Sequence, residues 1–348
     1  MKTTIRKIAQ LAGVSRGTVD KVVHGRTGVS DEVRAAVQQL IDELGYELPK
    51  RQKETGALEQ VQIAVIIPRL SNPFFEIVKR GMDSALVHFH DRNVQVEYFF
   101  CDGVNVNEVL SILDYIEEHG VDGIVLRGGQ SGRLCDRLNR FADKNIPVVL
   151  YDSDMPGCRR LCMVGEDSRA SGRVAASLLA KSIGGQGDVA IIGGLPDMLA
   201  HRARLHGFEQ AIRERYPSIR IVETINSRDQ SVIAYEKTGM LVQQYPNLRG
   251  IFSVVGCTGD IGQALIDRQA KNVKIVCYNF TDDVVALVKR GIVDFTIGLT
   301  PYRQGSVALH TLLKYLLDGE KPAAPFLEMP ILIGIDENIE VLSANQSL

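Results

Sequence analysis

The chain has 348 residues, more than one ordinary domain needs, so we expect two or three folding units. Apolar residues make up 45% of it and charged residues 24%, which is typical of a soluble globular protein and excludes a disordered chain. No apolar run approaches the ~18 residues of a membrane span. The first residues, MKTTIRKIAQLAG, lack the hydrophobic region of a signal peptide, so we expect a cytoplasmic protein with no membrane partner.

The net charge of −2 is unevenly distributed. Residues 1–30 carry six Lys and Arg side chains against the single acid Asp20, which makes a net charge of +5. A basic end on a mildly acidic body favours a nucleic-acid contact through that end. The six cysteines have no CxxC spacing and no histidine cluster beside them, so reduced thiols are a better interpretation than a zinc site. We expect no metal ion.

Residues 1–48 have the pattern of three short helices. Apolar residues recur at helical spacing up to Gly13, and Ser15 is a good N-cap for a second segment, SRGTVDKVVHG. A third segment begins after Ser30 with acidic residues in its first turn, and its apolar stripe continues to Gly45. A helix, a glycine turn, a second helix and a packing helix make up a helix-turn-helix unit.

Residues 49–61, PKRQKETGALEQV, are mostly polar and predict a linker. Ten short, β-branched apolar runs follow it, and helical stretches separate most of them. This alternation predicts parallel sheets covered on both faces, and ten strands indicate two α/β subdomains rather than one sheet. The predicted strands are 63–68, 94–100, 123–127, 147–152, 161–165, 189–194, 219–224, 250–256, 273–279 and 294–299; helices include 74–90, 107–119, 168–183, 201–216 and 301–317.

Polar residues follow several of these strands. Open α/β sheets bind ligands at the carboxyl ends of their strands, so these residues are expected to converge there. Apolar walls with a few polar groups suit a small polar ligand held between two lobes.

The first 46 residues closely resemble the DNA-binding headpiece of the lactose/galactose repressor family. The AGVS-x-x-TV core, the VSDEVR segment and the terminal ELGY match that headpiece in order and spacing. The remainder resembles the periplasmic sugar-binding-protein fold that the family uses as its sensor, closest to the ribose-binding branch. The matching segments are NPFF, IPVVLYD, an R-x-x-GF element, VCYNFTD and TIGLTPYRQG.

The resemblance implies an α/β protein in which an all-α helix-turn-helix headpiece precedes two doubly wound parallel-sheet subdomains of the type I periplasmic-binding-protein kind. The expected domains are a headpiece at 1–48, a linker at 49–61, and a sensor and dimerisation domain at 62–348. Within the sensor, we expect an N-subdomain at about 62–162 and 291–322, and a C-subdomain at about 163–290 and 323–348.

For the headpiece, the resemblance implies that the second helix lies in the major groove of operator DNA. Arg16, Gly17 and Lys21 occupy its base-reading positions, and an arginine there can pair with guanine O6 and N7. The full implied DNA-binding set is Thr4, Ser15, Arg16, Gly17, Thr18, Lys21, His24 and Arg26.

The linker departs from the family pattern. A typical member has a proline-asparagine pair after the tyrosine and then a hinge helix whose leucine wedges into the minor groove. Here Tyr46 is followed by ELPKRQKETGAL, in which Gly56 interrupts any helix and Leu58 is the sole candidate wedge. The nearby Lys and Arg residues can still contact phosphates.

For the sensor, the resemblance implies an effector site. The implied residues are Asn72, Phe74, Phe75, Arg127, Asp152, Arg204, Thr258 and Asn279. Core packing is an equally good interpretation of Phe75, and helix capping is comparable for Asp152 and Asn279. The alternative for Arg204 is a solvated surface residue.

Three departures bear on the ligand. Asn279 replaces the aspartate usual in ribose-type sites, Leu299 replaces a frequent glutamine, and Cys257-Thr258 replaces Asn-Asp. Fewer acceptors and the extra Arg127 argue against a plain ribose or glucose site. The alternative hypothesis is that Arg127 and Arg204 together serve a phosphorylated or acidic sugar.

The resulting prediction is a homodimeric transcriptional regulator, most readily a repressor, on a near-palindromic double-stranded operator, with a sugar or sugar-phosphate effector. The alternative is a sugar-binding protein of a transport or signalling system without DNA regulation. We expect no enzyme and no cofactor: the segment GGQGDVAIIGG matches neither a dinucleotide fingerprint nor a phosphate-binding loop, and no catalytic Ser-His-Asp or Cys-His order occurs.

Overall fold

The computed structural model describes residues 5–23, 29–43, 60–69, 73–102, 105–194 and 198–345. The chain divides into two compact units, Met1–Leu58 and Glu59–Leu348. The division falls inside the predicted linker. The linker residues on which the wedge and phosphate contacts depend, Lys50, Arg51, Lys53 and Leu58, lie outside the described residues.

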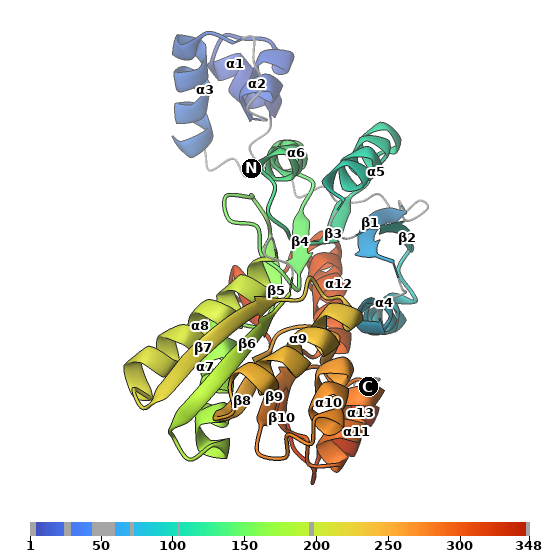
Figure 1. Ribbon diagram of the computed structural model, residues 1–348. Coiled ribbons are helices and arrows are strands. Elements are labelled where there is room, and N and C mark those ends of the chain that lie inside the picture. The colour runs from blue at the N-terminus through green and yellow to red at the C-terminus, as the bar shows by residue number, and fades with distance from the viewer. Residues whose placement is uncertain are drawn as a thin grey trace. The chain divides into compact units, whose positions relative to one another are not determined.

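The described part of the N-terminal unit consists of three helices, α1 (Ile5–Leu11), α2 (Arg16–Val23) and α3 (Asp31–Glu43) (Figure 1). Gly13 has a φ of +65°, a conformation that glycine adopts without a Cβ penalty, and so makes the turn between the first two helices. The Ser15 hydroxyl accepts the Thr18 N–H at 3.1 Å and thereby caps α2. One core joins the helices, with its buried side chains at Ile8, Ala9, Val19, Val22 and Val37.

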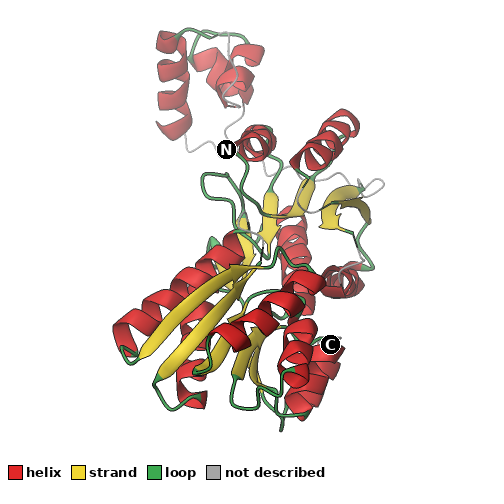
Figure 2. Cartoon of the chain, in the orientation of Figure 1, coloured by secondary structure: helices red, strands yellow, loops and turns green. Residues whose placement is uncertain are grey.

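The C-terminal unit contains two six-stranded sheets in its described residues. The first sheet is parallel, in the order β11-β5-β4-β3-β1-β2. Helices α4 and α12 cover one of its faces, and α5 and α6 cover the other (Figure 2). The elements are β1 (Val61–Pro68), α4 (Pro73–Leu86), a short 3₁₀ turn (Val87–Phe89), β2 (Val94–Cys101), α5 (Val106–His119), β3 (Gly123–Arg127), α6 (Gly132–Asp143), β4 (Val148–Tyr151), β5 (Cys162–Gly165), α12 (Pro301–Asp318) and β11 (Phe326–Glu328).

The second sheet has the equivalent order β12-β10-β9-β8-β6-β7, in which β12 is antiparallel to β10. Helices α7 and α8 cover one face, and α9, α10, α11 and α13 pack on the other. The elements are α7 (Ser168–Ser182), β6 (Gly187–Gly193), α8 (Leu199–Arg215), β7 (Ile219–Asn226), α9 (Ser231–Gln244), β8 (Leu248–Ser253), α10 (Thr258–Asp267), β9 (Lys274–Tyr278), α11 (Asp282–Lys289), β10 (Val293–Gly298), β12 (Leu332–Gly334) and α13 (Ile339–Asn345).

We call the two α/β halves the N-subdomain and the C-subdomain. The chain crosses between them after β5, after β10 and after β11. The expected boundaries at 162/163, 290/291 and 322/323 are therefore corrected: β5 pairs with β4 in the N-subdomain, β10 pairs with β9 in the C-subdomain, and β11 returns to β5. Backbone hydrogen bonding decides which sheet a strand joins, and an apolar run does not reveal its partner.

A pair of glycines sets the helix crossing in each subdomain. A Cβ on Gly81 of α4 would lie 1.9 Å from a carbonyl oxygen of α12, and one on Gly305 of α12 would lie 2.0 Å from a carbonyl oxygen of α4. The α7–α8 crossing has the same device at Gly172 and Gly207, with 2.0 and 2.1 Å. These distances are too short for any side chain at the four glycines. The glycines therefore allow α4 and α8 to pack close to their partner helices. Among the helices described above, none is long and apolar enough to cross a membrane.

Candidate functional site

A cleft of about 660 Å³ lies between the two subdomains, at the carboxyl ends of the strands. Both subdomains contribute to its walls, as expected for a ligand held between two lobes. Six of the predicted site residues line it, namely Phe74, Phe75, Arg127, Asp152, Arg204 and Asn279. Asn72 lies outside the described residues.

The N-subdomain wall combines two aromatic rings with an ion pair. Phe74 and Phe75 occupy the first turn of α4, and their rings meet edge to face with centroids 5.1 Å apart. Phe75 is buried in the core beneath the Arg127 guanidinium, whereas Phe74 is half-buried. The Arg127 Nε donates to Asp152 Oδ2 at 2.6 Å, with both side chains about nine-tenths buried. The Phe74 ring is therefore the better candidate for stacking on a ligand.

Arg204 is the most deeply buried polar residue of the C-subdomain wall. It is 4% exposed, so it is not a solvated surface residue. Its Nε donates to Glu166 Oε1 at 2.8 Å, its Nη2 donates to the same oxygen, and its guanidinium lies 4.3 Å from the centre of the Tyr278 ring. Burial is the largest single influence and lowers the pKa of Arg204, but the charge of Glu166, the Tyr278 hydroxyl, the hydrogen bonds to Glu166 and the charge of Asp152 together outweigh it, so the pKa is raised overall. Arg204 is thus a fixed, charged hydrogen-bond donor.

Asp152 and Asn279 occupy equivalent turns in the two subdomains. Each follows the fourth strand of its subdomain in chain order, β4 or β9, and has a positive φ, 61° for Asp152 and 72° for Asn279. Each N–H donates to the neighbouring strand, to Val164 at 3.0 Å and to Ile297 at 2.8 Å. Asp and Asn tolerate this left-handed conformation better than other residues that carry a Cβ. The turn directs both side chains to the cleft that they line.

His201 is a cleft residue that the sequence analysis missed. It is 7% exposed, and burial, followed by the charge of Arg204, lowers its pKa to about 3. The imidazole is therefore neutral at physiological pH, with one nitrogen able to donate and the other to accept. Residues three apart share a helix face, so its spacing from Arg204 was a signal that could have identified it.

Thr258 does not line the cleft. Its side chain is fully buried, its hydroxyl donates to the Val255 carbonyl at 3.1 Å, and it lies 3.4 Å from the Ser253 hydroxyl. The preceding residue, Cys257, lines the cleft instead. The change of one position at the start of α10 rotates the side chain by about 100° around the helix and so moves it to another face.

The predicted DNA-binding residues belong to the N-terminal unit. Ser15, Gly17 and Thr18 lie at the start of α2, where the Ser15 and Thr18 hydroxyls are 2.9 Å apart. Arg16 and Lys21 belong to the same helix by their backbone, but their side chains are outside what the structure describes. The remaining members, Thr4, His24 and Arg26, lie wholly outside the described residues.

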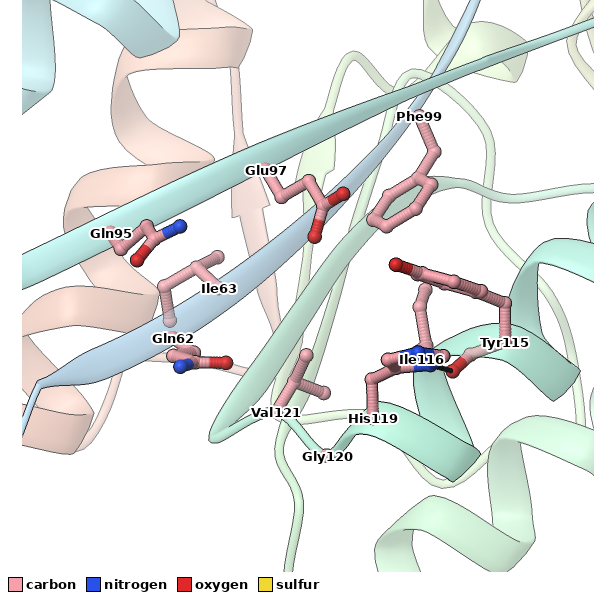
Figure 3. A pocket seen from close by; sticks show the side chains of 10 residues that line it. All are labelled: Gln62, Ile63, Gln95, Glu97, Phe99, Tyr115, Ile116, His119, Gly120 and Val121. Atoms are coloured by element: carbon pink, nitrogen blue, oxygen red, sulfur yellow. Dashed lines mark hydrogen bonds between the residues drawn. The ribbon is translucent and has the colours of Figure 1, made fainter.

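A second pocket, of about 30 Å³, lies at the opposite end of the first sheet (Figure 3). It is lined from β1, β2 and α5, where the Tyr115 and His119 rings are stacked 3.9 Å apart. Its volume is close to the share of one liquid water, so it is too small for an organic effector. The six cysteines are all free, and within the described ranges no group of three or more His, Cys, Asp or Glu could hold a metal ion.

Two α/β subdomains around a polar cleft, preceded by a helix-turn-helix, define the class of ligand-responsive DNA-binding proteins. Residues 63–321 match the family described as periplasmic binding protein domain, and residues 4–48 match bacterial regulatory proteins, lacI family. The chain belongs to the periplasmic binding protein domain family over most of its length, carries a lacI-family regulatory domain at its N-terminus, and has transcriptional regulators as its relatives.

Curated relatives agree with this assignment. The chain is 26% identical to the HTH-type transcriptional regulator DegA of Bacillus subtilis over 247 residues, 70% of this chain and 71% of that protein. It is 25% identical to the ribose operon repressor of Halalkalibacterium halodurans, over 72% of this chain and 71% of that protein. The fold also matches the solved structure of GanP, a glucose-galactose binding protein from Geobacillus stearothermophilus, with a TM-score of 0.73, 24% identity and coverage of 80% and 99%. The predicted family, fold class and regulatory function are confirmed, and a binding protein without DNA regulation is not favoured.

Proposed function

We propose that this regulator is a repressor whose operator affinity is controlled by a small sugar or sugar-derived effector bound in the cleft. The observation that carries the proposal is the composition of the two walls. Phe74 offers an apolar ring on one side, and Arg204 and Asn279 offer polar groups on the other. A sugar has an apolar ring face and hydroxyl edges, and a hydroxyl both donates and accepts, so the walls complement it. The similarity to a ribose operon repressor supports the same class of effector.

The cleft also supports a means of control. A ligand that contacts both subdomains binds best to the arrangement in which both walls reach it, and it shifts the protein toward that arrangement. Coupling to DNA binding then requires that the operator prefer one arrangement over the other. We propose binding without catalysis, because the carboxylates of Asp152 and Glu166 are held by arginines rather than set as a general acid and base.

On the DNA side, we propose that two copies of the chain read a near-palindromic operator, with α2 of each copy in the major groove. One headpiece offers too small an interface for tight specific binding, and two-fold symmetry matches a palindromic site. Binding to operator DNA also places the protein in the cytoplasm. Arg16 is the proposed base-reading residue, through guanine O6 and N7.

A sugar screen followed by operator binding tests the effector part. A ligand at a hundredfold excess over its Kd adds about 2.7 kcal/mol to stability, which a thermal-shift screen detects. The sugar found in this way should change operator affinity in fluorescence anisotropy. If no sugar or sugar derivative stabilises the protein, the proposed effector class is wrong.

Base substitution in the operator tests the DNA part. Arg16→Ala should cost about 1–3 kcal/mol of operator binding and relax the preference at one base of each half-site. Lys2→Ala, in the basic N-terminal end, should weaken specific and random DNA alike and serves as the control. Equal losses on both DNAs for Arg16→Ala would contradict the proposed base contact.

A further inference from the structure

Glu166 lies where the chain first crosses between the subdomains, between β5 and α7. It is 6% exposed. Its Oε1 accepts three hydrogen bonds: from Arg204 Nε at 2.8 Å, from Arg204 Nη2, and from the Ser168 hydroxyl at 3.3 Å. Because both Arg204 bonds end on this oxygen, Glu166 determines how the guanidinium is oriented.

The contacts of Arg204 leave only part of it for a ligand. One edge of the guanidinium is used by Glu166, and one face lies over the Tyr278 ring. The Tyr278 hydroxyl is itself held by the Ser171 hydroxyl at 3.0 Å, so the stacked pair is fixed from behind. The donors of Nη1 remain for a molecule in the cleft that Arg204 lines.

The residues that line the cleft carry three positive and three negative charges. Its charged lining residues are Arg80, Arg127, Arg204, Asp152, Asp229 and Asp282. The two buried arginines are each paired with a buried carboxylate, Arg127 with Asp152 and Arg204 with Glu166, while Arg80, Asp229 and Asp282 are exposed at the rim. An anionic ligand would therefore meet a carboxylate beside each buried arginine, Asp152 within the cleft lining and Glu166 behind Arg204, and a like charge at short range disfavours it.

We propose that Glu166 is a specificity-determining residue, which neutralises Arg204 so that the cleft accepts an uncharged sugar and excludes its phosphorylated or acidic counterpart. The inference rests on the proposed function, in which the effector is a sugar. Glu166 acts through Arg204 and does not touch the ligand, so it is a positioning residue. Because Glu166 is paired with Arg204, the Arg204 side chain can donate hydrogen bonds in a fixed direction while the pair carries no net charge.

A charge series tests the proposal. Glu166→Gln removes a negative charge, so the net charge of the Glu166–Arg204 pair becomes +1. Arg204→Met removes a positive charge, so the net charge becomes −1. The double variant returns the net charge of the pair to zero. The probes are D-ribose with D-ribose 5-phosphate, and D-glucose with D-glucuronate and D-glucose 6-phosphate, measured by calorimetry. The wild type should bind a neutral sugar at least about tenfold more tightly than its matched anion.

The ratio of neutral to anionic affinity should follow the local charge. It should fall about tenfold or more in Glu166→Gln, rise in Arg204→Met, and return toward the wild-type value in the double variant. Glu166→Asp keeps the charge and should keep the preference. A solely structural role for Glu166 would weaken neutral and charged probes equally and leave the ratio unchanged, which would overturn the proposal.

Two further outcomes separate this inference from the proposed function. A wild type that binds an anionic probe more tightly than its neutral partner overturns the role of Glu166 while leaving a sugar-responsive regulator intact. A wild type that binds no probe and no other sugar overturns the proposed function and this inference with it. If Glu166→Gln does not fold, Arg204→Met and the double variant still test the proposal. The same ratio of neutral to anionic affinity in these two variants would contradict it.

Discussion

In both α/β subdomains a tyrosine ends the fourth strand in chain order, and a polar residue with positive φ follows it. The pairs are Tyr151–Asp152 in the N-subdomain and Tyr278–Asn279 in the C-subdomain. Each subdomain also has one helix crossing in which two glycines let the backbones touch. The two halves therefore use the same local geometry to bring helix N-termini and strand ends to one cleft.

The side chains on this shared geometry differ. Helix α4 begins with two phenylalanines, whereas α8 presents His201 and Arg204 on its equivalent turns. The Tyr278 hydroxyl is held by Ser171, whereas the buried Tyr151 hydroxyl has no hydrogen-bond partner within the described residues. The backbone thus brings both walls to one cleft. The side chains put aromatic rings and an ion pair on the N-subdomain wall and His201 and Arg204 on the C-subdomain wall.

Substitution of the crossing glycines tests whether the two helix crossings are equivalent. We expect it to have the largest effect on stability. Gly81→Ala and Gly172→Ala should each lower the free energy of unfolding by about 3 kcal/mol, because the new Cβ overlaps a backbone oxygen that cannot rotate away. Urea unfolding monitored by circular dichroism measures both. Gly132→Ala, where a Cβ meets nothing within 4 Å, is the matched control. A loss in only one subdomain would show that the two crossings are not equivalent.

The polar wall can be tested at Arg204. Arg204→Ala removes a charge-assisted donor, which contributes about 1.5–3 kcal/mol, so the effector should bind one to two orders of magnitude more weakly. Calorimetry with the identified sugar measures this loss, and anisotropy should show little change in operator affinity without effector. Arg213→Ala, exposed on the same helix, is the control. An unchanged response to the effector would mean that Arg204 does not contribute to effector binding.

His201 in the C-subdomain wall makes the stability of the protein sensitive to acid. The pKa of His201 is lowered from 6.5 to about 3, so above pH 6.5 the residue is neutral in both states and contributes no pH dependence. Below pH 6.5 the unfolded chain binds a proton that the folded protein refuses, so stability falls by up to about 1.4 kcal/mol per pH unit toward the folded pKa.

His201→Gln should remove this part of the acid sensitivity. Stability of the wild type and the variant, measured by urea unfolding between pH 7 and 4, should diverge as the pH falls. His206→Gln, exposed on the same helix, should follow the wild type. Parallel curves for wild type and His201→Gln would mean that the imidazole is not held neutral.

The smallest effect is expected at the equivalent turns. At a φ of 72°, Asn279→Ala should be about 1 kcal/mol less stable than Asn279→Gly, because alanine pays a Cβ penalty in the left-handed region. Both variants lose the same amide, so the difference isolates the backbone. The same comparison at Asp152 should give a similar difference, and unequal values would show that the turns are not alike.

The sequence by itself predicted the helix-turn-helix, the ten strands of the alternating α/β pattern and six of the residues that line the cleft. These features depend on short-range signals. Ser15 caps the helix that follows it, strand runs are apolar because both faces of a parallel sheet are buried, and Asp152 and Asn279 directly follow such runs.

The tertiary structure alone decided the features that depend on distant partners. The positions of the three crossings follow from which strand β5, β10 and β11 pair with. Arg204 finds Glu166 at a separation of 38 residues, and this ion pair fixes the guanidinium within the cleft wall. Such long-range pairing leaves no periodicity in the sequence, because it arises only when separate helices and strands pack around a common core.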